Sequence, residues 1–221
     1  SNPITARVAV NRLWQQFFGI GIVSTSSDFG NQGTLPTHPK LLDWLARTYI
    51  EEDWNMKKMI KRIVMSKTYK QSSKPTPYKL KIDPKNYYLS RFPRQKLTAE
   101  MIRDNILVSS GLFVDKVGGP SVKPYQPPGL WDELTGGSTS NSLKRYVMST
   151  NGNQYRRSLY TFWKRTVPPP GMITFDASTR DYCTVERQKT STPLQSLVLL
   201  NDPQVQEAAE YLATSLILSL I

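Results

Sequence analysis

The sequence predicts a mainly α-helical fold, as a single irregular helical domain over residues 1–221 with long proline-rich loops and at most a short strand pair. Two observations predict this class. Apolar residues recur at helical spacing in about six segments, several of which start at a capping residue. The 16 prolines and 12 glycines of the chain indicate long irregular connections.

The first helix is expected between Asn2 and Gly21. Asn2 can cap it and Pro3 suits its first turn, while the two glycines at its far end favour a stop. Its apolar stripe comprises Ala6, Val10, Leu13, Trp14 and Phe17. Three polar residues lie off this stripe and are expected to reach carbonyls or carboxylates elsewhere: Arg7, Asn11 and Arg12.

The second helix is expected to start at Thr37-His38-Pro39, with Thr37 as its cap, and to end at the acids 51–53. Acids at a helix C-terminus oppose the helix dipole, so we expect a basic group to meet them. His38 is the single histidine of the chain. Beside a cap it is interpreted as a hydrogen-bonded structural group, with a ligand or proton carrier as the alternative.

A third helix is expected after Asn55, with one apolar and one basic face. Residues 55–103 hold 14 of the 29 basic residues and two of the 17 acidic ones, so this segment carries the whole net charge of +12. The basic face of the helix consists of Lys57, Lys58, Lys61 and Arg62. Such a face could bind a membrane surface, nucleic acid or an acidic partner, or could simply be solvated.

Two long surface loops are expected, at 70–96 and 118–155. The first interleaves lysines with Tyr78, Tyr87, Tyr88 and Phe92, a pattern that suits an anionic polymer, although the same aromatics could pin the loop to the core. A loop as long as the second is either functional or disordered. Its glycines lack the following Gly-Lys-Ser/Thr of a phosphate-binding loop.

A fourth helix is expected from residue 97 to Gly111. Glu100 and Asp104 share one of its faces, where paired carboxylates could do acid–base chemistry or hold a divalent ion. The alternative is an internal ion pair between Glu100 and Arg103. Residues 156–163 are the best strand candidate, although they could equally form a buried helix.

Two further helices are expected at the C-terminal end of the sequence. Thr192, Pro193 and Gln195 make a capping box for the first, and Asp202 and Pro203 start the second. The single cysteine, Cys183, excludes an internal disulfide and a thiolate metal cluster. No signal peptide or membrane-spanning segment is evident, and we expect a domain excised from a longer protein whose upstream part carries any targeting signal.

Seven segments occur in this chain in one order: NPITARVAVNRLWQQFFG, THPKLLDWLA, KTYKQSS, AEMIRDNIL, RRSLYTFWKR, FDASTRDYCTVER and TSTPLQSLVLLNDP. Together they resemble the domain-of-unknown-function family 1553, the planctomycete-type PSD domain, over nearly the whole chain. The run TPLQSLVLLNDP is the most distinctive. One departure is Lys40, where members often carry Glu that would complete a capping box with Thr37.

The resemblance implies a bacterial protein that is periplasmic or otherwise exported. It places this domain behind a related domain of unknown function, and often behind a c-type haem domain. The chain has no Cys-x-x-Cys-His, so haem c would lie in an upstream domain, and no cofactor or metal is expected in this chain. The family carries no assigned reaction, so the resemblance transfers no catalytic residue.

Two functions are compatible with these observations. The first is a structural or docking module whose basic segment 55–103 meets an acidic upstream domain of the same polypeptide. The alternative is an enzyme domain acting on an acidic polysaccharide; nucleic acid is not the expected partner. The candidate catalytic residues are His38, Glu100, Asp104 and Asp176. The candidate residues for anion or partner binding are Arg12, Lys57, Lys58, Lys61, Arg62, Arg103, Arg156, Arg157, Arg180 and Arg187.

Overall fold

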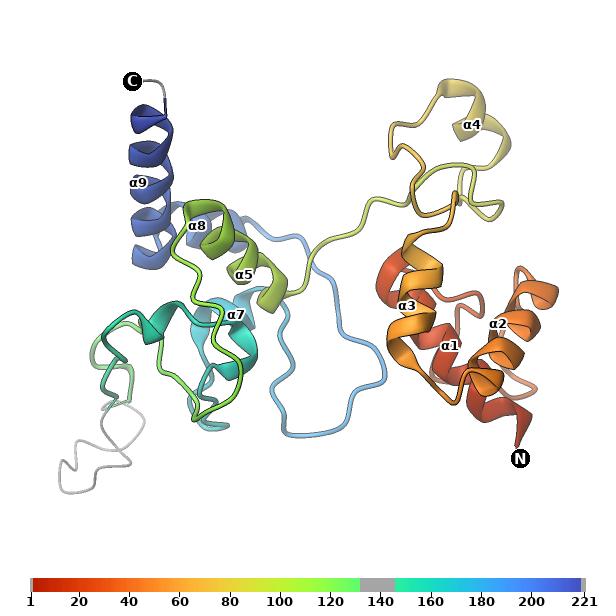
Figure 1. The fold of residues 1–221 in the computed structure, drawn as a ribbon, viewed down its shortest axis with the longest axis horizontal. Helices are drawn as coiled ribbons and strands as arrows, with labels where there is room; N and C mark the ends of the chain where they lie inside the picture. The colour runs from red at the N-terminus through yellow and green to blue at the C-terminus, as the bar shows by residue number, and fades with distance from the viewer. Residues whose placement is uncertain (1, 132–145, 220–221) are drawn as a thin grey trace. The chain divides into compact units, whose positions relative to one another are not determined.

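The computed structural model describes residues 2–131 and 146–219, and it is mainly α-helical, as the sequence predicts (Figure 1). The chain divides into two compact units, residues 1–96 and 97–221. That the two units make up one domain stays a prediction. Between residues 2 and 131, and again between 146 and 219, no helix is both long and apolar enough to cross a membrane.

The first unit contains α1 (Pro3–Phe18), α2 (Pro39–Glu51), α3 (Met56–Val64) and the short α4 (Pro77–Ile82). Helix α1 packs against α2 and α3 around one apolar core. Its stripe is buried as predicted at Val10 and Trp14, and Phe18 stacks on Trp14 with ring centroids 4.1 Å apart. Gly19 ends α1 at φ +80°, a conformation that glycine adopts without strain.

The start of α2 differs from the prediction. The residue that caps α2 is His38, and its side chain makes no capping hydrogen bond. Thr37 is held elsewhere, because both its backbone N–H and its hydroxyl donate to the carbonyl of Ile22, at 2.9 and 3.2 Å. At the other end of α2, Glu52 receives Arg62 at 2.5 Å, which is the basic group expected there.

The first long loop is partly folded. Residues 77–82 form α4 rather than an extended segment, and the buried Asp83 accepts the backbone N–H groups of Tyr87 and Tyr88 at 2.7 and 2.9 Å. Phe92 packs against Phe18, which pins the loop to the core. Tyr78, Tyr87 and Tyr88 remain exposed.

The second unit is built on α5 (Ala99–Ser110), which contacts α7 (Pro170–Thr174) and α9 (Pro203–Leu218). Helix α8 (Pro193–Asn201) packs against both α7 and α9. Two short 3-10 helices, η1 (Asn153–Tyr155) and η2 (Ser158–Tyr160), lie earlier in the chain. At the start of α8, Thr192 and Gln195 form the predicted capping box, in which the N–H of Thr192 donates to the Gln195 side chain at 3.3 Å.

The predicted strand at 156–163 is reduced to isolated bridges. Arg156 pairs with Val114 and Thr161 pairs with Val122, one on each side of η2. Within the second predicted loop, 118–155, the structure describes residues 118–131 and 146–155. Residues 132–145 of this loop lie outside the described residues.

Candidate functional site

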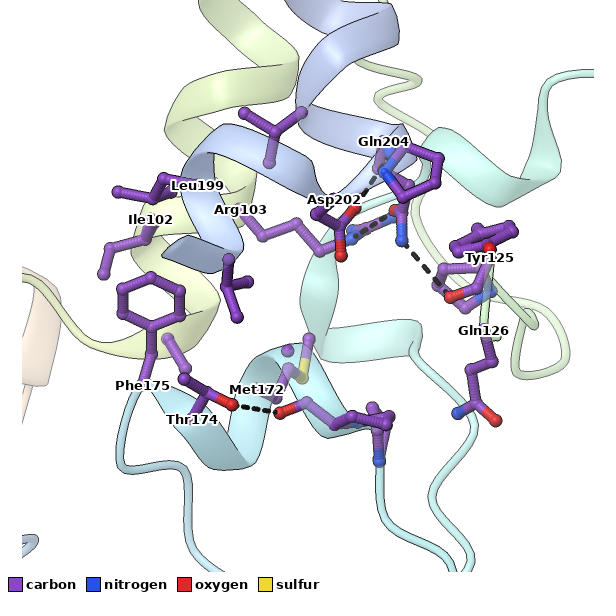
Figure 2. A pocket seen from close by; sticks show the side chains of 18 of the residues that line it. Ile102, Arg103, Tyr125, Gln126, Met172, Thr174, Phe175, Leu199, Asp202 and Gln204 are labelled. Carbon is purple, nitrogen blue, oxygen red and sulfur yellow. Dashed lines mark hydrogen bonds between the residues drawn. The ribbon is translucent and has the colours of Figure 1, made fainter. Parts of the chain in front are cut away.

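A cavity of about 390 Å³ opens in the second unit, between α5, α7, α8 and the start of α9 (Figure 2). A loop at 124–127 and prolines 169 and 170 complete its wall. Most of its lining is apolar: Ile102, Ile106, Leu107, Met172, Phe175, Leu197, Val198, Leu199 and Val205. A cavity of this size with an apolar lining has the dimensions of a small-molecule site.

One wall of the cavity is polar. Gln204 receives the Nε–H of Arg103 at 3.4 Å and donates its own Nε2–H to the carbonyl of Tyr125 at 3.3 Å. The backbone N–H of Gln204 donates to Oδ1 of Asp202 at 2.8 Å, which is the predicted cap of α9. Figure 2 shows these side chains side by side at the start of α9.

The second carboxylate oxygen of Asp202 faces α7. Oδ2 lies 3.8 Å from the position that a Cβ on Gly171 would occupy, and both residues line the cavity. Within the described parts of the chain no hydrogen-bond donor meets Oδ2, since the one bond to this side chain goes to Oδ1. Asp202 therefore presents an acceptor to the cavity.

Arg103 supports this wall from behind. Its guanidinium donates to the carbonyls of Gln154 and Arg156 at 2.6 and 2.9 Å and to the hydroxyl of Ser158 at 3.2 Å. Burial lowers the pKa of Arg103, and the charge of Asp104 leads the effects that oppose this lowering. Arg103 thus ties α5 to η1 and η2, and its N–H groups are largely committed to protein acceptors.

Tyr146 also lines the cavity, as Arg103 and Gln204 do. Its hydroxyl donates to the carbonyl of Pro124. Burial raises the pKa of Tyr146 well above its usual range, although the nearby charge of Arg103 acts in the opposite direction. The phenol therefore stays protonated and serves as a hydrogen-bond donor at neutral pH.

Arg156 is 2% exposed and holds a loop together. Its guanidinium donates to the carbonyls of Lys116, Gly118 and Pro120 at 2.8, 2.5 and 3.1 Å. It also stacks on the ring of Tyr160, with Cζ 4.0 Å from the centroid. These contacts make Arg156 a structural residue of the second unit.

The three carboxylates proposed for catalysis have separate partners. Glu100 pairs with Arg187 at 2.8 Å, and not with Arg103 as one interpretation of the sequence had it. Asp104 accepts the backbone N–H of Ser158 at 2.7 Å. Asp176 accepts the backbone N–H and the hydroxyl of Thr190, both at 2.8 Å.

The fourth candidate, His38, lies in the first unit, where its Nδ1 is 3.0 Å from the hydroxyl of Thr37. None of the four candidates is among the residues that line the cavity. No group of three or more His, Cys, Asp or Glu side chains suited to a metal ion occurs among the residues that the structure describes. A catalytic role for these residues stays a prediction.

The remaining basic candidates lie mostly on the surface. In the first unit, Arg12 and the α3 residues Lys57, Lys58 and Lys61 are exposed, and Arg62 also lies over the ring of Trp44. In the second unit, Arg157 pairs with Asp115 at 3.1 Å and Arg180 lies over the ring of Trp163. Their role in binding an anion or a partner stays a prediction.

The second notable feature is the α8–α9 surface, by which we mean the exposed apolar side chains of these two contacting helices. It consists of Leu194, Leu197, Leu199, Leu200, Tyr211, Leu212, Leu216, Ile217 and Leu218. Among the residues of α9, all of which the structure describes, only Ala208 is buried. Residues 211–219 carry no charged side chain, so the last turns of α9 present an uncharged apolar surface.

Sequence reasoning missed the cavity. Asp202 was recognised as a helix cap, but the sequence gives no sign that its second oxygen lacks a partner. Gly171 and Thr161 attract no attention in the sequence, although both line the cavity. Four segments far apart in the chain build this site together with Tyr146 and Thr161, and no local pattern predicts that they meet.

Comparison with curated proteins gives no match, and comparison with solved structures gives none. A family model matches residues 1–220, with the description PSD1, protein of unknown function (DUF1553). This match covers the segments on which the resemblance in the sequence rests. The chain therefore belongs to the PSD1 (DUF1553) family.

Proposed function

We propose that this chain is a docking module of an exported protein, and that the α8–α9 surface holds an upstream domain of the same polypeptide. The observation that carries this proposal is the exposure of large apolar side chains on two consecutive helices, including Leu200 at 72% and Leu218 at 68%. Apolar surface concentrated in this way marks interaction sites in soluble proteins.

The chemistry of α9 supports a protein partner. Its last turns expose Tyr211, Leu216 and Ile217 without a charged neighbour after Glu210. An apolar helix face of this kind binds in a hydrophobic groove of a partner, through side chains spaced three or four residues apart. The family resemblance puts a related domain upstream in the same polypeptide, which supplies such a partner at high effective concentration.

The basic face of α3 has a second role in this proposal. Lys57, Lys58 and Lys61 are exposed and form no ion pair within the parts of the chain that the structure describes. Charges outside a contact surface attract an oppositely charged partner over a distance, and they act mainly on the rate of association and on its dependence on salt. They would attract an acidic upstream domain, while the α8–α9 surface supplies the affinity.

Binding of the chain to its separately produced upstream domains tests the proposal, by titration calorimetry at rising salt. A double variant, Leu200→Glu with Leu216→Glu, should weaken binding by at least about tenfold, because it introduces charge into an apolar contact. Leu159→Glu is the matched control, since Leu159 is 74% exposed and belongs to η2. It should leave binding unchanged.

Two results would overturn the proposal. The first is equal binding by the wild type and the double variant. The second is self-association of the wild type that the double variant abolishes, with no affinity for the upstream domains, because the surface would then join two copies of the chain. A Lys57→Glu, Lys61→Glu variant should instead lower the association rate and flatten its dependence on salt.

A further inference from the structure

The cavity of the second unit has a chemistry of its own, although it shares Leu197 and Leu199 with the α8–α9 surface. Its volume of about 390 Å³ lies within the range of small-molecule sites. Its lining is mainly apolar, and three of its segments bring prolines to the wall: 124–127, 169–170 and Pro203. A largely apolar molecule would therefore gain free energy by leaving water for this cavity.

The free acceptor in the wall decides the polarity of such a molecule. Asp202 uses Oδ1 to cap α9, and Oδ2 faces α7 across the cavity (Figure 2). An ionised carboxylate only accepts hydrogen bonds. Asp202 is half-buried, so a molecule that fills the cavity takes water away from Oδ2. An acceptor that loses water without gaining a partner is costly, so this molecule must bring an N–H or O–H donor to the oxygen.

Arg103 decides the charge of the molecule. Four of its N–H groups are donated to Gln204, Arg156, Ser158 and Gln154, so the guanidinium has little left to offer an anion. Its positive charge nonetheless stays close enough to Asp202 for the two to interact. That charge balances the carboxylate and repels a second cation, which favours a neutral donor over an ammonium group.

Thr161 supplies an independent observation. Thr161 is 6% exposed and lines the cavity. Its hydroxyl has no hydrogen-bond partner among the residues described by the structure. Buried hydroxyls are almost always bonded, and an exception asks for an explanation. A polar atom of a bound molecule would satisfy this hydroxyl.

We propose that this cavity binds a neutral, largely apolar small molecule that donates an N–H or O–H group to Oδ2 of Asp202. The apolar part lies against α5 and α8, and the donor lies at the wall formed by the start of α9. The cavity thus selects by one hydrogen bond in an otherwise apolar site, as small-molecule sites commonly do.

Two fluorescent probes test the proposal directly. N-phenyl-1-naphthylamine is neutral and apolar and carries one N–H, and its N-methyl derivative lacks that donor. The wild-type chain should bind the N–H probe at one saturable site, and it should prefer this probe to the N-methyl derivative by at least about fivefold. Binding of both probes with equal affinity would overturn the proposal.

Two variants locate the site. Gly171→Leu should abolish binding by filling the cavity, and its Cβ meets only Oδ2 of Asp202, at an ordinary contact distance of 3.8 Å. Asp202→Asn keeps a good helix cap but places an NH₂ group where Oδ2 lies, so it should remove the preference for the N–H probe. Circular dichroism and thermal unfolding establish that each variant is folded.

The control keeps this proposal separate from the docking proposal. Leu200 belongs to the α8–α9 surface but does not line the cavity. Leu200→Glu should therefore leave probe binding unchanged while it weakens docking. Probe binding that survives Gly171→Leu but is lost in Leu200→Glu would overturn the cavity proposal, because the probe would then lie on the exposed helix surface.

Discussion

At the scale of single residues, the neighbouring Arg156 and Arg157 have the same side chain but different surroundings and roles. Arg156 is buried and donates to three backbone carbonyls, whereas Arg157 is exposed and pairs with Asp115. A guanidinium reaches several acceptors at fixed angles, and an ammonium group cannot reproduce this arrangement. The sequence, in which both residues belong to one motif, does not separate them.

Substitution by lysine tests this difference. Arg156→Lys should lower the free energy of unfolding by about 2–3 kcal/mol, because an ammonium group in this buried position cannot donate to all three carbonyls. Arg157→Lys should change it by less than about 0.5 kcal/mol, since exposed ion pairs contribute little. Urea denaturation of both variants measures the difference, and equal effects would show that Arg156 does not hold the 116–120 loop.

The pair of Glu100 and Arg187 predicts an effect of pH. Burial alone would raise the pKa of Glu100, but hydrogen bonds from Arg187 and from the backbone, with the charge of Arg187, outweigh it and lower the pKa. A carboxylate whose pKa is lower in the folded state stabilises the fold above its unfolded pKa of about 4.3. This stability is lost as the pH falls through the folded pKa.

Arg187→Gln should therefore lower the free energy of unfolding at pH 7 by about 0.5–1 kcal/mol. It should also reduce the loss of stability between about pH 5 and pH 3. Arg165→Gln removes the same charge from an exposed position in this unit and serves as the control. A steeper loss of stability at acid pH in Arg187→Gln would contradict the assignment of this ion pair.

At the scale of elements, helix starts are well predicted from sequence where one side chain decides them. Asn2, Asn55 and Asp202 each accept a backbone N–H from the first turn of their helices. Thr37 fails as a cap because the carbonyl of Ile22, distant in sequence, takes its hydroxyl. The 156–163 segment fails as a strand because Arg156 and Thr161 find only single-residue partners.

Asn11 on α1 connects an element to the loop that follows it. It is fully buried, and its side chain exchanges two hydrogen bonds with the backbone of Val23, at 2.9 and 3.0 Å. The prediction that Asn11 bonds to a carbonyl elsewhere in the chain is confirmed. Its burial is not predicted by the sequence, because Asn11 lies off the apolar stripe. The Asn11 amide bonds to both the N–H and the carbonyl of one residue, as a neighbouring strand does, and so fixes the backbone after α1.

Asn11→Leu should lower the free energy of unfolding by about 2–4 kcal/mol, because the side chain keeps its approximate size while the N–H and carbonyl of Val23 lose their partners. Gln16→Leu, at an exposed position of α1, should cost less than about 0.5 kcal/mol. Thermal unfolding of both variants checks the prediction. A stable Asn11→Leu variant would mean that the loop does not depend on this amide.

At the scale of the whole molecule, the helical class and the six longer helices follow from the sequence, since periodicity and caps are local signals. The short helices α4 and α7 are not predicted. The cavity and the partners of Glu100, Arg103 and Arg156 are not predicted either, because each depends on contacts between segments that lie tens of residues apart. The division into units at residues 96 and 97 falls where the predicted loop 70–96 meets the predicted fourth helix, but neither signal by itself predicts two units.

The α8–α9 surface is the feature of the whole molecule on which the docking proposal rests. Helix α9 buries Ala208, and it exposes apolar residues along its second half. A helix with so little of its apolar surface covered depends on a partner for part of its stability. The upstream domain of the intact polypeptide is the partner that we propose.

Hydrogen–deuterium exchange of the intact polypeptide, compared with this chain alone, tests that proposal most directly. The backbone N–H groups of residues 211–218 should exchange at least about tenfold more slowly in the intact polypeptide, because a covered helix opens less often. Those of α1 should exchange at the same rate in both. Equal exchange of residues 211–218 in the two proteins would show that nothing upstream covers α9, and would contradict the proposed docking function.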